Sequence, residues 1–130
     1  MKKVIDFLNH AGVYYLATTD GQQSHVRPIG FVMEYKGQLA FCTDNRKAMY
    51  RQLTANPQVE ICCYDGSSTL RICGKAVFCT SGEAQQKALE IMPALKNMYS
   101  VGDGIFEIYC LEYDQAVRST MSGESEVWPA

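Results

Sequence analysis

Two dipeptides typical of tight turns, Asp20-Gly21 and Lys36-Gly37, each stand between runs of β-branched and aromatic residues. Such dipeptides favour the short connections that join antiparallel strands. The first turn should therefore pair a strand over Val13–Thr19 with one over His25–Tyr35, and the second should add a strand over Gln38–Thr43. A meander of this kind, placed before any substantial helix, restricts the chain to folds built on an antiparallel sheet.

The rest of the chain continues the strand pattern. Strands are expected at Val59–Tyr64, Thr69–Thr80 and Ile105–Tyr113, with a shorter extended piece at Ala116–Met121. Within the long second run, Gly74 predicts a bulge or a barrel corner. Roughly six or seven antiparallel strands favour a small barrel, because closing a sheet removes its exposed edges. The predicted fold class is mainly β.

Three short helices are expected around this sheet. Apolar spacing, capping residues and helix stops place them at Met1–Gly12, Arg46–Ala55 and Ser81–Met92. Asp44 or Asn45 is the expected cap of the second helix. The polar tail Ser122–Ala130 is expected to be mobile. Residues 1–130 are predicted to form one domain.

The composition limits the classes of molecule that the protein is expected to bind and the compartment in which it is expected to work. The net charge of −2 is spread along the chain, which argues against nucleic acid and favours a small molecule or a second copy of the chain. The six cysteines lie in apolar runs without Cys-x-x-Cys spacing, so we expect them to be reduced and buried; metal binding or redox cycling is the alternative. With no apolar signal run and no membrane-spanning stretch, we expect a cytoplasmic protein that does not bind membranes.

One stretch carries most of the candidate chemistry. Arg27 lies in one predicted strand, and Thr43, Asn45, Arg46 and Lys47 follow the next, around the start of a helix whose dipole favours an anion. Charge-assisted hydrogen bonds contribute about 1.5 to 3 kcal/mol each, so three or four could anchor a monophosphate. Neither a Rossmann nor a Walker glycine motif is present, so side chains rather than a glycine-rich loop must bind the phosphate. The alternative is that these are ordinary solvated charges.

The order of several short motifs in this stretch matches a known pattern. They are Arg27-Pro28, Phe41-Cys42-Thr43, Arg46-Lys47, Asn56-Pro57 and Gly74-Lys75-Ala76. In this order they resemble the pyridoxamine 5'-phosphate oxidase-like, FMN-binding split β-barrel family, and most closely its short bacterial branch of general stress proteins and nitroimidazole-reductase relatives. The resemblance covers about Val13–Met92.

The resemblance implies a split β-barrel homodimer with two FMN sites at the subunit interface. It implies that the strand opening at Arg27 lies along the flavin, that Arg46-Lys47 binds the phosphate, and that Thr69 stands where the oxidase usually has glutamine. The cofactor-binding residues implied are Arg27, Pro28, Ile29, Cys42, Thr43, Asn45, Arg46, Lys47 and Thr69. Thr69 is shorter than glutamine. The oxidase's C-terminal arginine segment is not recognisable, so pyridoxamine 5'-phosphate oxidation is not the first choice.

The expected function is that of an FMN-dependent oxidoreductase, in which NAD(P)H reduces the flavin and a small organic molecule reoxidises it. No catalytic residue stands out, although His25 could donate a proton and Tyr109 could contact the ring. Trp128 either covers the ring across a dimer or belongs to the mobile tail. The alternatives are a flavin- or haem-binding module without turnover and a dimer without a cofactor.

Overall fold

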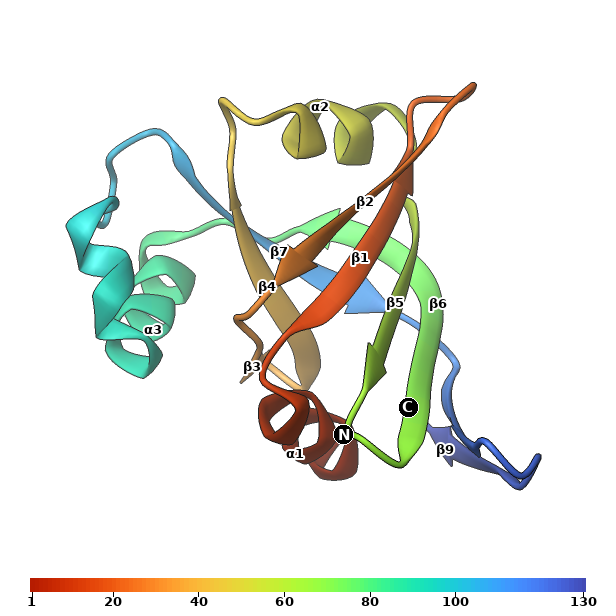
Figure 1. The fold of residues 1–130 in the computed structure, drawn as a ribbon. Helices are drawn as coiled ribbons and strands as arrows, with labels where there is room; N and C mark the ends of the chain where they lie inside the picture. Colours follow the sequence, from red (N-terminus) through yellow and green to blue (C-terminus); the bar gives the residue numbers. More distant parts are fainter.

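The computed structural model describes all 130 residues as one curled antiparallel sheet with helices at its ends and side (Figure 1). In chain order the elements are α1 (Lys2–Ala11), β1 (Tyr14–Thr19), β2 (Ser24–Ile29), β3 (Met33–Tyr35), β4 (Gln38–Asp44), α2 (Ala48–Ala55), β5 (Gln58–Tyr64), β6 (Ser68–Phe78), α3 (Gly82–Ile91), the 3-10 helix η1 (Pro93–Asn97), β7 (Phe106–Glu112), β8 (Gln115–Thr120) and β9 (Ser125–Pro129).

The strand order is β2-β1-β5-β6-β7-β4-β3, and β8 and β9 extend from β6 as a separate arm. The 11-residue β6 pairs with β8 through its first half and with β7 through its second half. Gly74 lies between these two pairings, where β6 leaves one partner for the other. The curvature this produces makes the sheet a half-barrel, which confirms the mainly β, antiparallel split-barrel prediction.

Nine strands form where six or seven were expected. The predicted run His25–Tyr35 is divided at Gly30–Val32 into β2 and β3. The Lys36-Gly37 turn forms as predicted, with φ of 49° and 78° between the paired residues Tyr35 and Gln38. The first hairpin also forms, but its loop is four residues long, because the Asp20 carboxylate accepts hydrogen bonds from the Gln22 and Gln23 amides.

Two hydrophobic clusters lie on opposite faces of β4 and β7, as strand alternation requires. The first fills the barrel and includes Phe41 and Tyr109, whose rings stack with centroids 5.5 Å apart. The second packs α3 and η1 against the outer face and includes Ala40, Ile108 and Tyr99. The lobe formed by α3 and η1 therefore packs on β4, the strand that precedes the predicted phosphate-binding residues Arg46 and Lys47.

The prediction of reduced, buried cysteines is wrong for one disulfide pair and for Cys73, which is exposed. Cys79 and Cys110 form a disulfide with Cα atoms 6.2 Å apart, while Cys42, Cys62, Cys63 and Cys73 are free. The 31-residue separation gives no local sign of the pairing. The two cysteines meet because the end of β6 lies beside β7, where the Cys79 amide donates to the Ile108 carbonyl.

The C-terminal tail contains a strand that the sequence did not predict. Residues 125–129 form β9, which pairs with β8, and the Trp128 ring packs edge-on against Phe7 of α1 at 6.2 Å. The Lys3 ammonium lies 5.6 Å from the same ring. Trp128 therefore contacts the first helix of its own chain.

No helix is both long enough and apolar enough to cross a membrane.

Candidate functional site

The segment between β4 and α2 holds a buried carboxylate that orients an exposed arginine. Asp44 Oδ1 accepts from the Arg46 amide at 2.8 Å and from Arg46 Nε at 2.9 Å, and Oδ2 accepts from Arg46 Nη2 at 2.5 Å. The Asp44 side chain is 4% exposed, and that of Arg46 is 64% exposed. The Arg46 guanidinium holds the pKa of Asp44 well below its usual range. The fork of Arg46 is thus fixed, with Nη1 left without a protein partner.

Tyr99 completes this arrangement from beyond η1. Its hydroxyl donates to Asp44 Oδ2 at 3.0 Å, and its ring stacks on Phe106 with centroids 4.6 Å apart. Burial, reinforced by the hydrogen bond to Asp44, raises the pKa of Tyr99 to about 12. The hydroxyl therefore stays protonated at neutral pH and acts as a donor.

Lys47 stands beside this cluster at the start of α2. It is exposed, its side chain has no hydrogen bond or ion pair, and its extended backbone precedes a helix that no side chain caps. The expected capping of α2 by Asp44 or Asn45 does not occur. The Asp44 carboxylate binds Arg46 instead. The side-chain amide of Asn45 donates to Gly104 O and to Glu107 Oε2. A helix N-terminus next to the unpaired Lys47 ammonium suits an anion.

Thr43 and Cys42 point to opposite faces of β4. Thr43 is 5% exposed, and its hydroxyl is buried without a partner. Cys42 is half-buried against the second cluster, and burial raises the pKa of its thiol to about 12. Cys42 is therefore a protonated, apolar contact at neutral pH, whereas Thr43 has unused hydrogen-bonding capacity.

The Arg27 side chain is hydrogen-bonded to other residues of its own chain. Its Nη1 donates to Leu16 O at 3.1 Å and to Thr18 Oγ1 at 2.8 Å, and its Nη2 donates to Gln52 Oε1 at 2.7 Å. Thr18 also donates to Gln52 Oε1 at 2.6 Å. The guanidinium has no carboxylate partner, and burial lowers its pKa. Arg27 thus links β2, β1 and α2 on the core-facing side of the sheet, while Pro28 is exposed on the other side.

Thr69 lies apart from the other predicted residues within one chain. The register places it opposite Tyr64 on β5 and Ser119 on β8, at the hairpin end of β6. Thr43, Asn45, Arg46 and Lys47 are consecutive or nearly so, and Arg27 reaches the helix that Lys47 begins. The fold therefore brings most of the predicted residues to one end of the barrel and leaves Thr69 elsewhere.

Two residues with possible catalytic or ring contacts, His25 and Tyr109, lie outside this region. His25 Nε2 is 3.0 Å from Asp20 Oδ2 in the β1–β2 loop. Tyr109 is completely buried inside the barrel, with an unpartnered hydroxyl. Neither residue is placed beside the Asp44–Lys47 segment. Sequence reasoning missed Gln52 and Tyr99, and no local pattern marks either one as a site residue.

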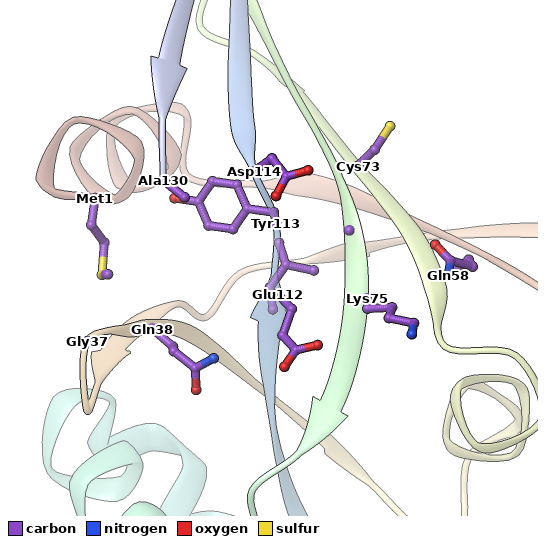
Figure 2. A pocket seen from close by; sticks show the side chains of 12 residues that line it. Met1, Gly37, Gln38, Gln58, Cys73, Lys75, Glu112, Tyr113, Asp114 and Ala130 are labelled. Carbon is purple, nitrogen blue, oxygen red and sulfur yellow. The ribbon is translucent and has the colours of Figure 1, made fainter.

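A hollow of about 630 Å³ lies elsewhere, between β6, the end of β7 and both chain termini (Figure 2). Its charged side chains are Lys75, Glu112 and Asp114. None of the predicted site residues lines it. With two carboxylates and one ammonium among its lining side chains, this hollow does not suit a phosphate.

Comparison with known proteins gives a consistent result. The family profile described as pyridoxamine 5'-phosphate oxidase matches residues 1–111. A NimC/NimA family protein from Clostridium acetobutylicum is 38% identical; the match covers 100% of this chain and 92% of that one, with a TM-score of 0.94. No curated protein matches the chain significantly.

Two more distant structures share the fold. A pyridoxamine 5'-phosphate oxidase-related, FMN-binding protein from Nostoc punctiforme is 19% identical, with 97% of this chain and 87% of that chain covered and a TM-score of 0.67. A haem-binding protein from Mycobacterium smegmatis is 17% identical, with 94% and 57% covered and a TM-score of 0.72. The same barrel thus occurs in proteins with different cofactors.

Proposed function

Because the chain belongs to the pyridoxamine 5'-phosphate oxidase family, we propose that it is an FMN-binding flavoprotein acting as an NAD(P)H-dependent oxidoreductase on a small organic molecule. The observation that carries the proposal is the segment after β4. There an oriented Arg46 fork, an unpaired Lys47 and an uncapped helix start are adjacent. A phosphate monoester matches these groups in charge and in hydrogen-bonding capacity.

The residues present fit FMN in part. Arg46 and Lys47 would hold the phosphate, and the buried Thr43 hydroxyl, which has no protein partner, is a further group that a ligand could satisfy. Pro28 is exposed and would contact the ring, whereas Ile29 packs against the first cluster and Cys42 against the second, so these two would reach the ring only through their exposed edges. Arg27 would hold the strand that carries Pro28, through Thr18 and Gln52. Thr69 could join only from a second subunit.

When bound, FMN would supply the hydride chemistry. The protein's own groups would bind and orient the cofactor, and no side chain near the segment is placed as a dedicated acid or base. A flavin- or haem-binding module without turnover is the alternative. Haem is the weaker choice here, because His10 and His25 are the only histidines and His25 is engaged by Asp20.

The proposal includes a homodimer with the flavin at the interface. The outward faces of β1, β2 and β5 expose apolar side chains, with Tyr15 at 48%, Val26 at 68% and Tyr64 at 55%. The strand register puts all three on the same face of the sheet. An apolar face next to the Pro28 edge would let a second copy close over the ring.

The test is the visible spectrum of the purified protein, followed by titration of the apoprotein with FMN and with riboflavin, which lacks the phosphate. Lys47→Ala is expected to weaken FMN binding about tenfold, since a charge-assisted contact is lost, and to leave riboflavin binding unchanged. Lys75→Ala, another exposed lysine, is the matched control. Turnover is tested by anaerobic addition of NADH or NADPH, which should bleach the flavin band.

Failure of wild-type protein to bind FMN would contradict the proposed cofactor. Equal affinity of wild-type protein and Lys47→Ala for FMN would contradict the phosphate site. Bound FMN that neither NADH nor NADPH reduces would favour the module without turnover.

A further inference from the structure

The Asp44 carboxylate connects two parts of the chain that are far apart in sequence. It accepts four hydrogen bonds, three from Arg46 and one from the hydroxyl of Tyr99, which is 55 positions away. Asp44 ends β4, whereas Tyr99 belongs to the lobe that α3 and η1 form on the outer face of the sheet. The lobe therefore contributes directly to the group that orients Arg46.

The Tyr99 hydroxyl has no other partner, and its ring is held independently of Asp44 by stacking on Phe106 at an interplanar angle of 11°. Both side chains are buried, with Tyr99 8% and Phe106 0% exposed. The hydroxyl can therefore be removed without removing the packing of the ring. Its function is separable from the stability of the second cluster.

We propose that Tyr99 is a positioning residue for phosphate recognition: it fixes Asp44 Oδ2, and Asp44 in turn holds the Arg46 fork so that Nη1 faces the ligand. This inference rests on the proposed function and assigns a part of the phosphate site to the α3–η1 lobe. A bidentate fork is useful only when its plane is fixed, because each hydrogen bond depends on direction. A buried acid with all its acceptor positions occupied provides that fixed frame.

Asp44 could have the opposite role and compete with the phosphate for the Arg46 guanidinium. A carboxylate paired with Arg46 could lower the affinity for phosphate by neutralising the guanidinium. The two roles predict opposite signs, because loosening the network would weaken phosphate binding if it positions Arg46 and strengthen it if it competes. The net local charge of the segment stays positive, since Lys47 has no acidic partner.

The experiment measures the Kd of FMN and of riboflavin for the full-length apoprotein by quenching of flavin fluorescence. Tyr99→Phe is expected to weaken FMN binding about fivefold and to leave riboflavin binding within about twofold of wild type. Tyr35→Phe is the matched control, because it removes a buried hydroxyl from the same cluster that bonds only to Ser81 Oγ, at 3.3 Å. It should change neither Kd.

A second variant separates orientation from a general effect on folding. In an Arg46→Ala background, Tyr99→Phe should have no further effect on FMN affinity, since the residue it acts through is missing. Equal losses of FMN and riboflavin, tighter FMN binding, or the same fivefold loss in the Arg46→Ala background would each overturn the inference. Wild-type protein that binds neither flavin would overturn the proposed function and this inference with it, whereas a Lys47→Ala effect without a Tyr99→Phe effect would overturn this inference alone.

Discussion

The positively charged Arg27 side chain stabilises the packing of α2 on β1 and β2. Its guanidinium joins two strands and α2 through Leu16 O, Thr18 and Gln52, with no carboxylate to neutralise it. Hydrogen bonds from a charged donor contribute more than neutral ones, and removing the donor leaves Gln52 and Thr18 with reduced pairing in a part-buried place. Loss of Arg27 should therefore affect stability before it affects any ligand.

Arg27→Ala is predicted to lower the free energy of unfolding by about 2 to 3 kcal/mol, because three hydrogen bonds are lost. Gln52→Ala should cost less, and the double variant should fall short of the sum by about 1 kcal/mol, since the two residues share one bond. Urea unfolding measures all three variants. Arg51→Ala, an exposed arginine on the same helix, is the control with an expected change under about 0.5 kcal/mol. Unchanged stability in Arg27→Ala, with loss of flavin, would instead make Arg27 a ligand.

At the scale of elements, the long strand β6 shapes the sheet. Its first half pairs with β8 and its second half with β7, so the chain must cross between partners at Gly74. A Cβ at Gly74 would lie 2.5 Å from Glu112 O and 2.9 Å from Leu111 Cδ1. Because the nearest atom belongs to the backbone of β7, the contact cannot be relieved by a side-chain rotation. The crossing therefore requires glycine.

Gly74→Ala is predicted to destabilise the fold by about 2 to 3 kcal/mol, because β6 and β7 must separate to admit the methyl group. The measurement is the urea midpoint, with the amide exchange of β7 as a local readout. Gly82→Ala is the matched control, since a Cβ there meets Val101 Cγ1 at an ordinary 3.6 Å. Should both substitutions be tolerated equally, the close crossing at Gly74 does not constrain the sheet.

At the scale of the whole molecule, the outward face of β1, β2 and β5 is notable because it exposes large apolar side chains. Val26 is the most exposed of its apolar side chains, at 68%, and it points away from the barrel interior that Leu16 and Ile61 fill. The proposed dimer would bury this face and bring Thr69 of one subunit toward the cofactor of the other. One interface would then serve both assembly and the site.

Val26→Asp is predicted to raise the Kd of the dimer by about 100-fold or more, because an unpaired carboxylate would be buried at the contact. Light scattering after size exclusion should show the change, and FMN binding should weaken in parallel. Ile91→Asp, which places the same charge on an exposed site of α3, should leave the assembly intact. A wild-type monomer, or a dimer unaffected by Val26→Asp, would contradict this interface.

Local patterns in the sequence were enough to predict the antiparallel framework. The Lys36-Gly37 turn, the alternating burial along β5, and the three helices follow from residues that are near neighbours in the chain. The placement of Arg46 and Lys47 between a strand end and a helix start is equally local. Such features depend on backbone preferences and on burial of one face, which short stretches encode by themselves.

Only the tertiary structure decided which side chains those residues meet. The bond from Tyr99 to Asp44, the pairing of Cys79 with Cys110, the inward direction of Arg27 and the packing of Trp128 on Phe7 all join distant segments. Each depends on how far the sheet curls and on where the α3–η1 lobe rests. Those quantities are set by the packing of the whole chain, so no window of sequence contains them.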